Sequence, residues 1–374
     1  MKIAMLGHKR IPSREGGVEV VVEELTTRMA SQGHQVVVYN RKGKHVADAS
    51  YSLKKMKEYK GVSIKQVATI DKKGMNALIY SIFASIRATF GRYDVIHYHA
   101  EGSCAMLWLP KLFGIHTVAT IHGLDWQRSK WGGFATKYLK FGEKMAAKKA
   151  DQVIVLSKNM QRYFKENYGR DTVYIPNGLT MPTRREVKLI TDKFHLQYGE
   201  YILFLARIVP EKGVHYLIDA YEQIKTDKKL VIAGGASHTS EYFEEIKARV
   251  KDNPNIIMTG FVQDELLEEL YSNCCLYVLP SDVEGMPISL LEAMGYGRRC
   301  LVSDIPENTE LVGEHAAVFA HGNVEDLAKH LQELADQEKV ECLENISYVQ
   351  EHFNWDRIVQ ITLELYKKTS RVET

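Results

Sequence analysis

Two basic residues, Arg207 and Lys212, lie on either side of a short turn that contains a proline. The turn, Ala206-Arg-Ile-Val-Pro-Glu-Lys-Gly213, follows an apolar run that is typical of a buried strand. A guanidinium and an ammonium group at this spacing can converge on one anion, and together they suit a diphosphate. Negative charge grows on a diphosphate as the bond to it breaks, so cations placed there stabilise the transition state more than the ground state. The alternative is a pair of unrelated surface charges.

Two glutamates, Glu284 and Glu292, stand eight residues apart in the segment 281–294. The segment follows an apolar run, turns at Gly285 and is predicted to enter a helix at Pro287, because proline is favoured early in a helix. The first N–H groups of such a helix can bind a sugar or phosphate, and a carboxylate can accept two sugar hydroxyls. Glu292 stands among apolar helix positions, so we expect it to have a partner inside the protein. A surface helix residue is the alternative.

In the first half of the chain, candidate ligand contacts also follow predicted strands. Gly16-Gly17 ends the loop after the first strand, where paired glycines let backbone N–H groups approach a phosphate or sugar. His122 follows the fifth strand and could hydrogen-bond a sugar hydroxyl, and Asp125 on the same loop could orient an acceptor. An ordinary turn, a structural histidine and a helix cap are the respective alternatives. No G-x-G-x-x-G motif is present here, which argues against a dinucleotide-binding domain.

A repeated unit of strand, turn and helix positions these residues. Its strands are continuous Val, Ile and Leu runs, as expected for a parallel sheet covered on both faces. The expected strands are 3–6, 36–39, 62–66, 95–98, 118–121, 153–156 and 173–175 in the first half, and 202–205, 230–233, 256–259, 276–279, 301–303 and 318–320 in the second. The sequence thus predicts two doubly wound α/β domains, 1–178 and 179–353, followed by an amphipathic helix after Trp355. Ligands of such folds bind beyond the carboxyl ends of the strands, so we expect one cleft between the two domains.

The composition indicates a globular protein and excludes a disordered chain, a fibre or a disulfide scaffold. Its five cysteines form no Cys-x-x-Cys pair and are expected to be reduced thiols of a cytoplasmic protein. No apolar run is long enough for a signal peptide or a membrane span. Residues 1–170 contain 29 Lys and Arg against 13 Asp and Glu, a net charge of +16, whereas the remainder contains 20 against 34, a net charge of −14. The cationic half would therefore be attracted to an anionic surface.

Taken in order, these motifs resemble the large family of retaining GT-B glycosyltransferases (glycosyltransferase family four), over essentially the whole chain. The resemblance is carried by Gly16-Gly17, the His122 loop, Pro176-Asn177-Gly178, the turn from Arg207 to Gly213, Gly234-Gly235, Gly260-Phe261, and the E-x7-E motif of Glu284 and Glu292. Two stretches, Ile11-Pro12…Gly16-Gly17-Val18-Glu19 and His122-Gly-Leu-Asp125-Trp126, are most similar to a bacterial branch that includes rhamnosyltransferases. Val18 departs from that branch, which often has an aromatic residue there.

The resemblance implies a GT-B fold, in which two Rossmann-like domains face a central cleft. The N-terminal domain would face the acceptor and the membrane, the C-terminal domain would bind the nucleotide-sugar donor, and the final helix, 354–374, would pack back on the first domain. Arg207 and Lys212 would bind the donor diphosphate, and Glu292 would accept the ribose hydroxyls. The implied donor-binding residues are Gly16, Gly17, Asn177, Arg207, Lys212, Gly234, Phe261, Val262, Glu284, Gly285, Met286, Pro287, Ile288 and Glu292. The implied catalytic groups are His122, Arg207, Lys212 and Glu284, with Asp125 at the acceptor. Such enzymes need no protein nucleophile, metal or other cofactor, and the chain has no Asp-x-Asp motif.

Basic and aromatic residues interleave between Arg128 and Lys149. At helical spacing Phe134, Tyr138, Phe141 and Met145 share one face, which lysines flank. With the clusters Lys54-Lys55-Lys57 and Lys72-Lys73, this pattern favours docking on acidic lipid. A core-facing helix with a basic outer side is the alternative. Nucleic acid is not an expected partner, because no recognised motif accompanies the charge.

The sequence therefore predicts a cytoplasmic glycosyltransferase, peripheral at the inner face of the membrane. It would move a hexose such as rhamnose from a nucleotide-diphosphate donor to a lipid-linked or growing saccharide in capsule, O-antigen or cell-wall polysaccharide synthesis. A sugar-nucleotide epimerase and a non-catalytic sugar-nucleotide-binding subunit are the alternatives. An epimerase would be expected to lack the E-x7-E helix, and the intact Arg207, Lys212 and Glu292 argue against a non-catalytic subunit.

Overall fold

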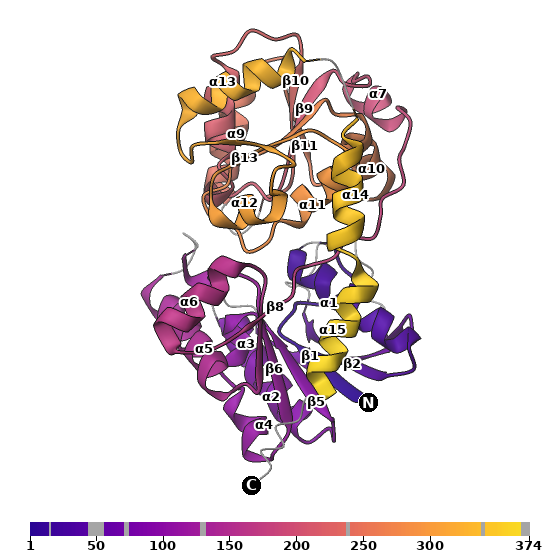
Figure 1. Cartoon of the computed structure of the whole chain (residues 1–374), viewed down its shortest axis with the longest axis vertical. Helices are drawn as coiled ribbons and strands as arrows, with labels where there is room; N and C mark the ends of the chain where they lie inside the picture. The colour runs from indigo at the N-terminus through magenta and orange to yellow at the C-terminus, as the bar shows by residue number, and fades with distance from the viewer. Residues whose placement is uncertain are drawn as a thin grey trace. The chain divides into compact units, whose positions relative to one another are not determined.

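Two compact units form the chain (Figure 1). Unit 1 comprises Met1–Gln127, Trp131–Gly178 and the C-terminal segment from Trp355, and unit 2 comprises Leu179–Asn354. The computed structural model describes residues 1–14, 16–43, 56–70, 75–127, 132–236, 240–337 and 341–367. The last described helix, α15 (Trp355–Lys367), thus belongs to the first unit although it ends the chain.

Unit 1 is built on an eight-stranded sheet in the order β3-β4-β2-β1-β5-β6-β7-β8. Its strands are β1 (Lys2–Leu6), β2 (Gln35–Lys42), β3 (Glu58–Tyr59), β4 (Val62–Ala68), β5 (Val95–His99), β6 (His116–Ile121), β7 (Gln152–Val155) and β8 (Val173–Tyr174). Seven of them are the predicted strands. The two-residue strand β3 was not predicted, and it pairs antiparallel with β4, so the sheet is mixed and not wholly parallel. Along β4 exposed and buried residues alternate, which shows that this edge of the sheet is covered less than its centre.

Helices cover both faces of this sheet. One face packs on α2 (Met75–Thr89), α3 (Glu101–Cys104), α5 (Gly133–Lys149) and α6 (Lys158–Tyr168), around a core that includes Tyr80, Cys104, Ala146 and Phe164. The other face packs on α1 (Gly17–Ser31) and α15. The short helices α4 (Trp108–Leu112) and η2 (Asp125–Gln127) complete the unit. Because β5, β6 and β7 contribute buried side chains to both faces, they read as continuous apolar runs in the sequence.

Unit 2 is a six-stranded, wholly parallel sheet in the order β11-β10-β9-β12-β13-β14. The strands are β9 (Tyr201–Leu205), β10 (Lys229–Ala233), β11 (Ile256–Gly260), β12 (Leu276–Leu279), β13 (Cys300–Ser303) and β14 (Ala317–Phe319), all of them predicted. The helices are α7 (Leu189–Phe194), η3 (Pro210–Lys212), α8 (Val214–Tyr221), α9 (Ser240–Val250), α10 (Asp264–Asn273), α11 (Ile288–Gly295), α12 (Pro306–Val312), α13 (Val324–Ala335) and α14 (Leu343–His352). The order changes direction between β9 and β12, which is where ligands bind in doubly wound sheets. The prediction of two doubly wound α/β units is confirmed.

The basic helix differs in part from its expected arrangement. Helix α5 buries Leu139, Glu143 and Ala146, and leaves Phe134 and Phe141 exposed. Tyr138 was expected on the same outer face, but its hydroxyl donates a hydrogen bond to the Gly102 carbonyl inside the unit (2.7 Å). Other residues of the pattern that predicted docking on acidic lipid lie outside the described residues. They are Lys54, Lys55, Lys72, Lys73, Arg128, Lys130 and Trp131.

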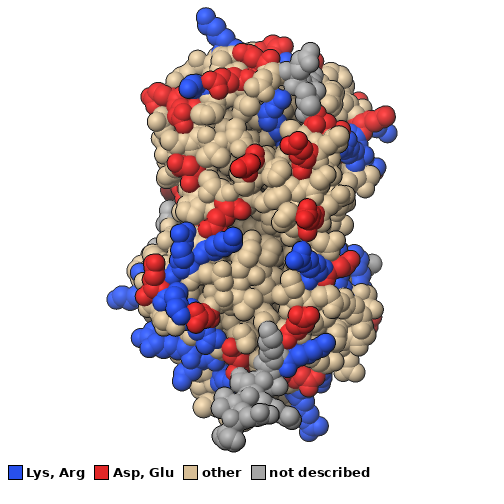
Figure 2. All heavy atoms as spheres, in the orientation of Figure 1, with Lys and Arg blue, Asp and Glu red and all other residues tan. Residues whose placement is uncertain are grey.

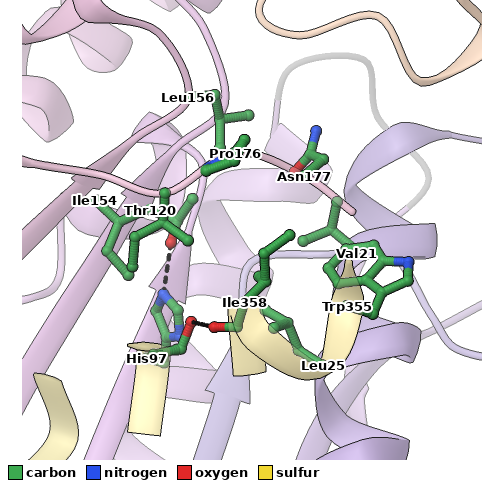
Figure 3. Close-up of a pocket in the computed structure, with 12 residues that line it drawn as sticks. Val21, Leu25, His97, Thr120, Ile154, Leu156, Pro176, Asn177, Trp355 and Ile358 are labelled. Carbon is green, nitrogen blue, oxygen red and sulfur yellow. Dashed lines mark hydrogen bonds between the residues drawn. The ribbon is translucent and has the colours of Figure 1, made fainter. Parts of the chain in front are cut away.

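Helix α15 is held on unit 1 by a buried histidine. The His97 ring on β5 lies between the Tyr366 hydroxyl on α15 (2.6 Å) and the Thr120 hydroxyl on β6 (2.7 Å). Beside it lies a small cavity, lined in part by Asn177 and Trp355 (Figure 3). Burial lowers the pKa of His97 to about 3, and the nearby His122 contributes to the shift. His97 is therefore neutral, so one ring nitrogen donates while the other accepts.

We predict that this neutral histidine makes unit 1 sensitive to acid. When the unit unfolds, His97 regains an ordinary pKa near 6.5 and takes up a proton that the folded state excludes, so stability falls as pH drops below about 6.5. The slope is about 1.4 kcal/mol per pH unit for one such histidine. All four tryptophans belong to unit 1, so tryptophan fluorescence in urea titrations of the full chain reports its unfolding. His97→Asn should flatten the slope between pH 6.5 and 5, whereas His352→Asn, at an exposed position, should not. Equal slopes in all three proteins would contradict the prediction.

The close approach of α5 to α3 depends on a glycine. A Cβ atom at Gly142 would lie 2.0 Å from the Glu101 carbonyl oxygen, which is backbone and cannot turn away. We predict that Gly142→Ala destabilises unit 1 by about 1–3 kcal/mol, reduced by up to about 1 kcal/mol of gained helix propensity. At Gly133, on the same helix, an added Cβ would meet no described atom within 4 Å, so Gly133→Ala should be neutral or stabilising. Thermal melts followed by tryptophan fluorescence would compare the two, and equal melting temperatures would disprove the close contact.

Candidate active site

The loops after β9 and β12 meet at the carboxyl edge of the unit 2 sheet. The turn η3 ends at Gly213, whose backbone is left-handed (φ +67°), and a Cβ there would lie 1.9 Å from the Pro280 carbonyl oxygen. Only glycine allows the turn to rest against the end of β12 in this way. The Asp282 N–H then donates a hydrogen bond to the Glu211 carbonyl (3.0 Å). These backbone contacts fix the turn that carries Lys212 against the segment that carries Glu284.

An ion pair joins the two loops. The Lys212 ammonium lies 2.5 Å from Oε1 of Glu284, and the side chains are 13% and 6% exposed. The same carboxylate oxygen accepts a hydrogen bond from the Ser281 hydroxyl (2.7 Å). The hydroxyl of Ser303 on β13 in turn donates to the Ser281 carbonyl (2.6 Å). Because the pair is largely withdrawn from water, salt screens it less than a surface pair.

Glu292 has the internal partner that the sequence analysis expected. The Tyr271 hydroxyl on α10 lies 2.9 Å from Oε2 of Glu292. Burial, together with the charge of Glu292, holds the pKa of Tyr271 well above its ordinary value, so the phenol stays protonated and donates. Tyr277 on β12 has its pKa raised chiefly by burial, with smaller contributions from Glu284 and Glu292. Both carboxylates thus act on one buried phenol at the end of β12.

The other unit 2 candidates also follow strands. Arg207 is the second residue after β9, and Gly234 comes directly after β10. A Cβ at Gly234 (φ +156°) would lie 1.8 Å from the Ala206 carbonyl oxygen, so these two strand ends touch through backbone. Phe261, after β11, is 52% exposed, and Val262 is buried. Gly285, Met286 and Pro287 are buried before α11, which begins at Ile288. The helix thus begins one residue after Pro287, close to its predicted start, and Pro287 is its N-cap.

In unit 1, His122 follows β6 and contacts a second histidine. Its Nε2 lies 3.0 Å from Nδ1 of His99, the last residue of β5, and the two rings are stacked at 5.3 Å. Burial, with nearby His97, His122 and His8, holds the pKa of His99 well below its ordinary value. His99 is therefore a neutral partner that fixes the orientation of the His122 ring. The sequence analysis missed His99, although the polar pair in Ile96-His-Tyr-His99 at the end of an apolar strand was a signal for it.

The loop that carries Asp125 is anchored through its neighbour. The Trp126 indole N–H donates to Oε2 of Glu143 (2.9 Å), and Oε1 of this buried carboxylate accepts from Tyr163 (2.9 Å) and Tyr168. Three donors on one carboxylate compensate for its burial. Asp125 itself is the first residue of the short helix η2.

The glycine pair and Asn177 lie at other strand ends of unit 1. Gly16 caps α1 and Gly17 is its first residue. A Cβ at Gly16 would lie 2.4 Å from Glu19, whose Oε1 accepts a hydrogen bond from the Lys9 N–H (2.9 Å). Asn177 is only 3% exposed and lines the cavity beneath α15 (Figure 3). Contact between Asn177 and the nucleotide-sugar donor stays a prediction from the resemblance.

The structure therefore pairs Lys212 with Glu284 across the loops that follow β9 and β12, with Arg207 in the same turn as Lys212 and Glu292 on α11, the helix after β12. Two cations beside two carboxylates can hold an anionic group and, next to it, hydroxyl groups. Among the residues that the structure describes, no group of three or more His, Cys, Asp or Glu side chains could hold a metal ion.

Two family models match the chain, one on each half. Residues 15–181 match the model described as Glycosyltransferase Family 4, and residues 191–349 match Glycosyl transferases group 1. An uncharacterized glycosyltransferase of Methanocaldococcus jannaschii is 26% identical, over 98% of this chain and 98% of its own length. The alpha-maltose-1-phosphate synthase of Mycolicibacterium smegmatis is 24% identical, over 99% of this chain and 100% of its own.

Solved structures share the fold over the same length. Sucrose-phosphate synthase from Thermosynechococcus elongatus superposes with a TM-score of 0.82 at 22% identity, covering 98% of each chain. The Anabaena protein HepE in complex with UDP-glucose superposes with a TM-score of 0.80 at 18% identity, covering 99% of this chain and 100% of that one. With both halves matched by glycosyltransferase models and the whole fold shared with GT-B structures, the chain belongs to the GT-B glycosyltransferases.

Proposed function

We propose that this enzyme takes a hexose from a nucleotide-diphosphate donor held by unit 2 and passes it to a saccharide acceptor. The observation that carries the proposal is the Lys212–Glu284 ion pair, placed with Arg207 at the switch point between β9 and β12. The structure of HepE with UDP-glucose, which shares the fold, supports a sugar nucleotide as the donor.

In the proposed reaction, Arg207 and Lys212 bind the donor diphosphate. The bond between the sugar carbon and the diphosphate oxygen breaks, and the electron pair stays on the phosphate. Positive groups held in place by the protein stabilise this developing charge without having to reorganise. Glu284 keeps the Lys212 ammonium in position and contacts the donor sugar together with the amides of Gly285, Met286 and Ile288.

Glu292 serves binding more than bond breaking in this proposal. Its carboxylate accepts the ribose hydroxyls of the donor, while Tyr271 fixes its orientation. The main chain at Phe261 and Val262, and the glycine at Gly234, contact the base side of the nucleotide. Loss of Glu292 should therefore weaken the interaction with donor throughout the reaction.

On the acceptor side we propose roles for residues of unit 1. His122, oriented by His99, contacts the donor sugar, Gly16 and Gly17 lie against the donor, and Asp125 orients the acceptor hydroxyl. The acceptor oxygen forms the new bond on the face that the diphosphate leaves, and its proton passes to the departing phosphate oxygen. The anomeric configuration is then retained without a protein nucleophile.

The proposed acceptor is a lipid-linked or growing saccharide at the inner face of the membrane, in capsule, O-antigen or cell-wall polysaccharide synthesis. Support comes from relatives over part of the chain, such as the O-antigen chain mannosyltransferase B of Escherichia coli, which is 26% identical over 48% of this chain. A rhamnosyl donor, as the resemblance of the Gly16-Gly17 and His122 loops implies, is included in the proposal.

We predict that Lys212→Ala and Glu292→Gln each lower kcat/KM by about 100-fold or more while the protein stays folded, by analogy with the loss of one charge-stabilising donor. Lys247→Ala is the matched control, because this lysine is exposed on α9 and pairs only loosely with Glu244 (3.9 Å). Turnover with a nucleotide-sugar donor and a soluble acceptor analogue is the measurement. Near-normal turnover in both site variants would contradict the site assignment.

We further predict that the reaction needs no bound metal. Charge stabilisation by Arg207 and Lys212 takes the place of a cation on the diphosphate, so chelation should leave the rate unchanged. Initial rates with EDTA, and with Mg²⁺ or Mn²⁺ restored, test this. A rate that falls on chelation and returns with the metal would show that the two basic residues do not suffice.

A further inference from the structure

Helix α2 buries two serines beside Tyr80, Ala84 and Ala88, and leaves larger apolar residues exposed. Two serines, Ser81 and Ser85, are buried on the inner side, at 2% and 0% exposure. Large apolar residues lie outside instead, with Phe83 at 50% and Phe90 at 66%, just past the helix end. A helix that merely covers a core would place these side chains the other way round.

Helix α4 continues this apolar surface. Leu112 is 74% exposed and Phe113 is 56% exposed, and the ring of Phe113 contacts that of Phe90 edge-on at 5.3 Å. Trp108 and Ile86, each 39% exposed, lie on the same two helices. We call Phe83, Ile86, Phe90, Trp108, Leu112 and Phe113 the α2–α4 surface. Contiguous exposed apolar surface of this kind marks a binding site for a protein or a membrane.

The helix that packs on α4 exposes charge of one sign only. Helix α5, which packs on α4, exposes Lys137, Lys140 and Lys144. Its one acidic residue, Glu143, is buried with three hydrogen-bond donors, and α2 and α4 contain no acidic residue. In Figure 2, Lys and Arg side chains gather on the part of unit 1 where α5 and α6 lie.

We propose that the α2–α4 surface inserts into the interface of a bilayer that contains acidic lipid, with the lysines of α5 on the headgroups. Aromatic and aliphatic side chains enter the headgroup–acyl boundary, and nearby lysines add attraction to anionic lipid. No described helix is long and apolar enough to cross a bilayer. The proposal deepens the membrane-side acceptor proposed above and rests on it, but it can be tested without turnover.

Two other occupants fit the observations less well. A second copy of the chain, related by a two-fold axis at this surface, would bring the α5 lysines of both copies close together, and α2, α4 and α5 offer no exposed carboxylate to neutralise them. A nucleic acid would use the lysines but has no use for Leu112 and Ile86, which offer neither stacking nor hydrogen bonds.

The test is co-sedimentation of the full chain with vesicles of phosphatidylcholine alone or mixed with phosphatidylglycerol. The triple variant Phe90→Ser, Leu112→Ser, Phe113→Ser should bind mixed vesicles about 100-fold or more weakly than the wild type, because each buried side chain of this size contributes more than 1 kcal/mol. Leu343→Ser, which changes a 63% exposed leucine of unit 2, is the matched control and should bind as the wild type does. Equal binding by the triple variant and the wild type would overturn the proposal.

A second measurement does not depend on the triple variant being stable. Lipids brominated in the upper acyl chain should quench wild-type tryptophan fluorescence, and Trp108→Phe should remove most of that quenching. Quenching that is unchanged in Trp108→Phe would overturn the proposal. Light scattering gives the state of association, and a dimer that the triple variant dissociates without a change in vesicle binding would assign the surface to self-association.

Activity in solution separates this proposal from the proposed function. The triple variant should transfer sugar to a water-soluble acceptor analogue as fast as the wild type does. Its loss should appear only with an acceptor embedded in vesicles. If the wild type bound vesicles as expected but transferred no sugar to either acceptor, the membrane surface would stand and the proposed function would fail.

Discussion

The ion pair between Lys212 and Glu284 is the contact on which the candidate site depends. It joins the loops that follow β9 and β12. A close backbone contact also holds these loops together, because Gly213 packs directly against the Pro280 carbonyl. A pair this well withdrawn from water keeps most of its Coulomb attraction. The lysine is thereby fixed before any donor binds, so its charge needs no rearrangement when negative charge develops beside it.

Unit 2 extends this arrangement through buried hydroxyl groups. Tyr271 holds Glu292, and Tyr277 lies within the electrostatic range of Glu284 and Glu292. Burial keeps both phenols protonated. Tyr271 therefore remains a donor to the Glu292 carboxylate, which would otherwise be costly to place at this depth, and Tyr277 donates to the Ser289 hydroxyl (2.8 Å). Unit 2 thus holds a carboxylate positioned by a neutral donor, Glu292 with Tyr271, and a cation positioned by a carboxylate, Lys212 with Glu284.

Unit 1 follows a different principle. Its strand ends carry neutral histidines, His8, His97 and His99, whose pKa values burial lowers. One of them fastens α15 to the sheet, and another orients His122. The lysines of α5 lie on the outside of this unit, on the helix that packs on α4.

The sequence by itself determined both sheets, because parallel strands that are buried on two faces must be continuous apolar runs, and it located Arg207, Lys212, Glu284 and Glu292 at strand ends. The sequence did not predict β3, because a strand of two residues is too short to show a periodic pattern of apolar residues. Only the tertiary structure decided which partner each charge has. Lys212 meets Glu284 because β9 and β12, which are far apart in the chain, end at one edge of a sheet, and Glu292 meets Tyr271 because α10 and α11, the helices before and after β12, contact each other. The outward side of α2 was likewise decided by packing: its apolar residues surround the helix, and only contact with the sheet selects the face that stays exposed.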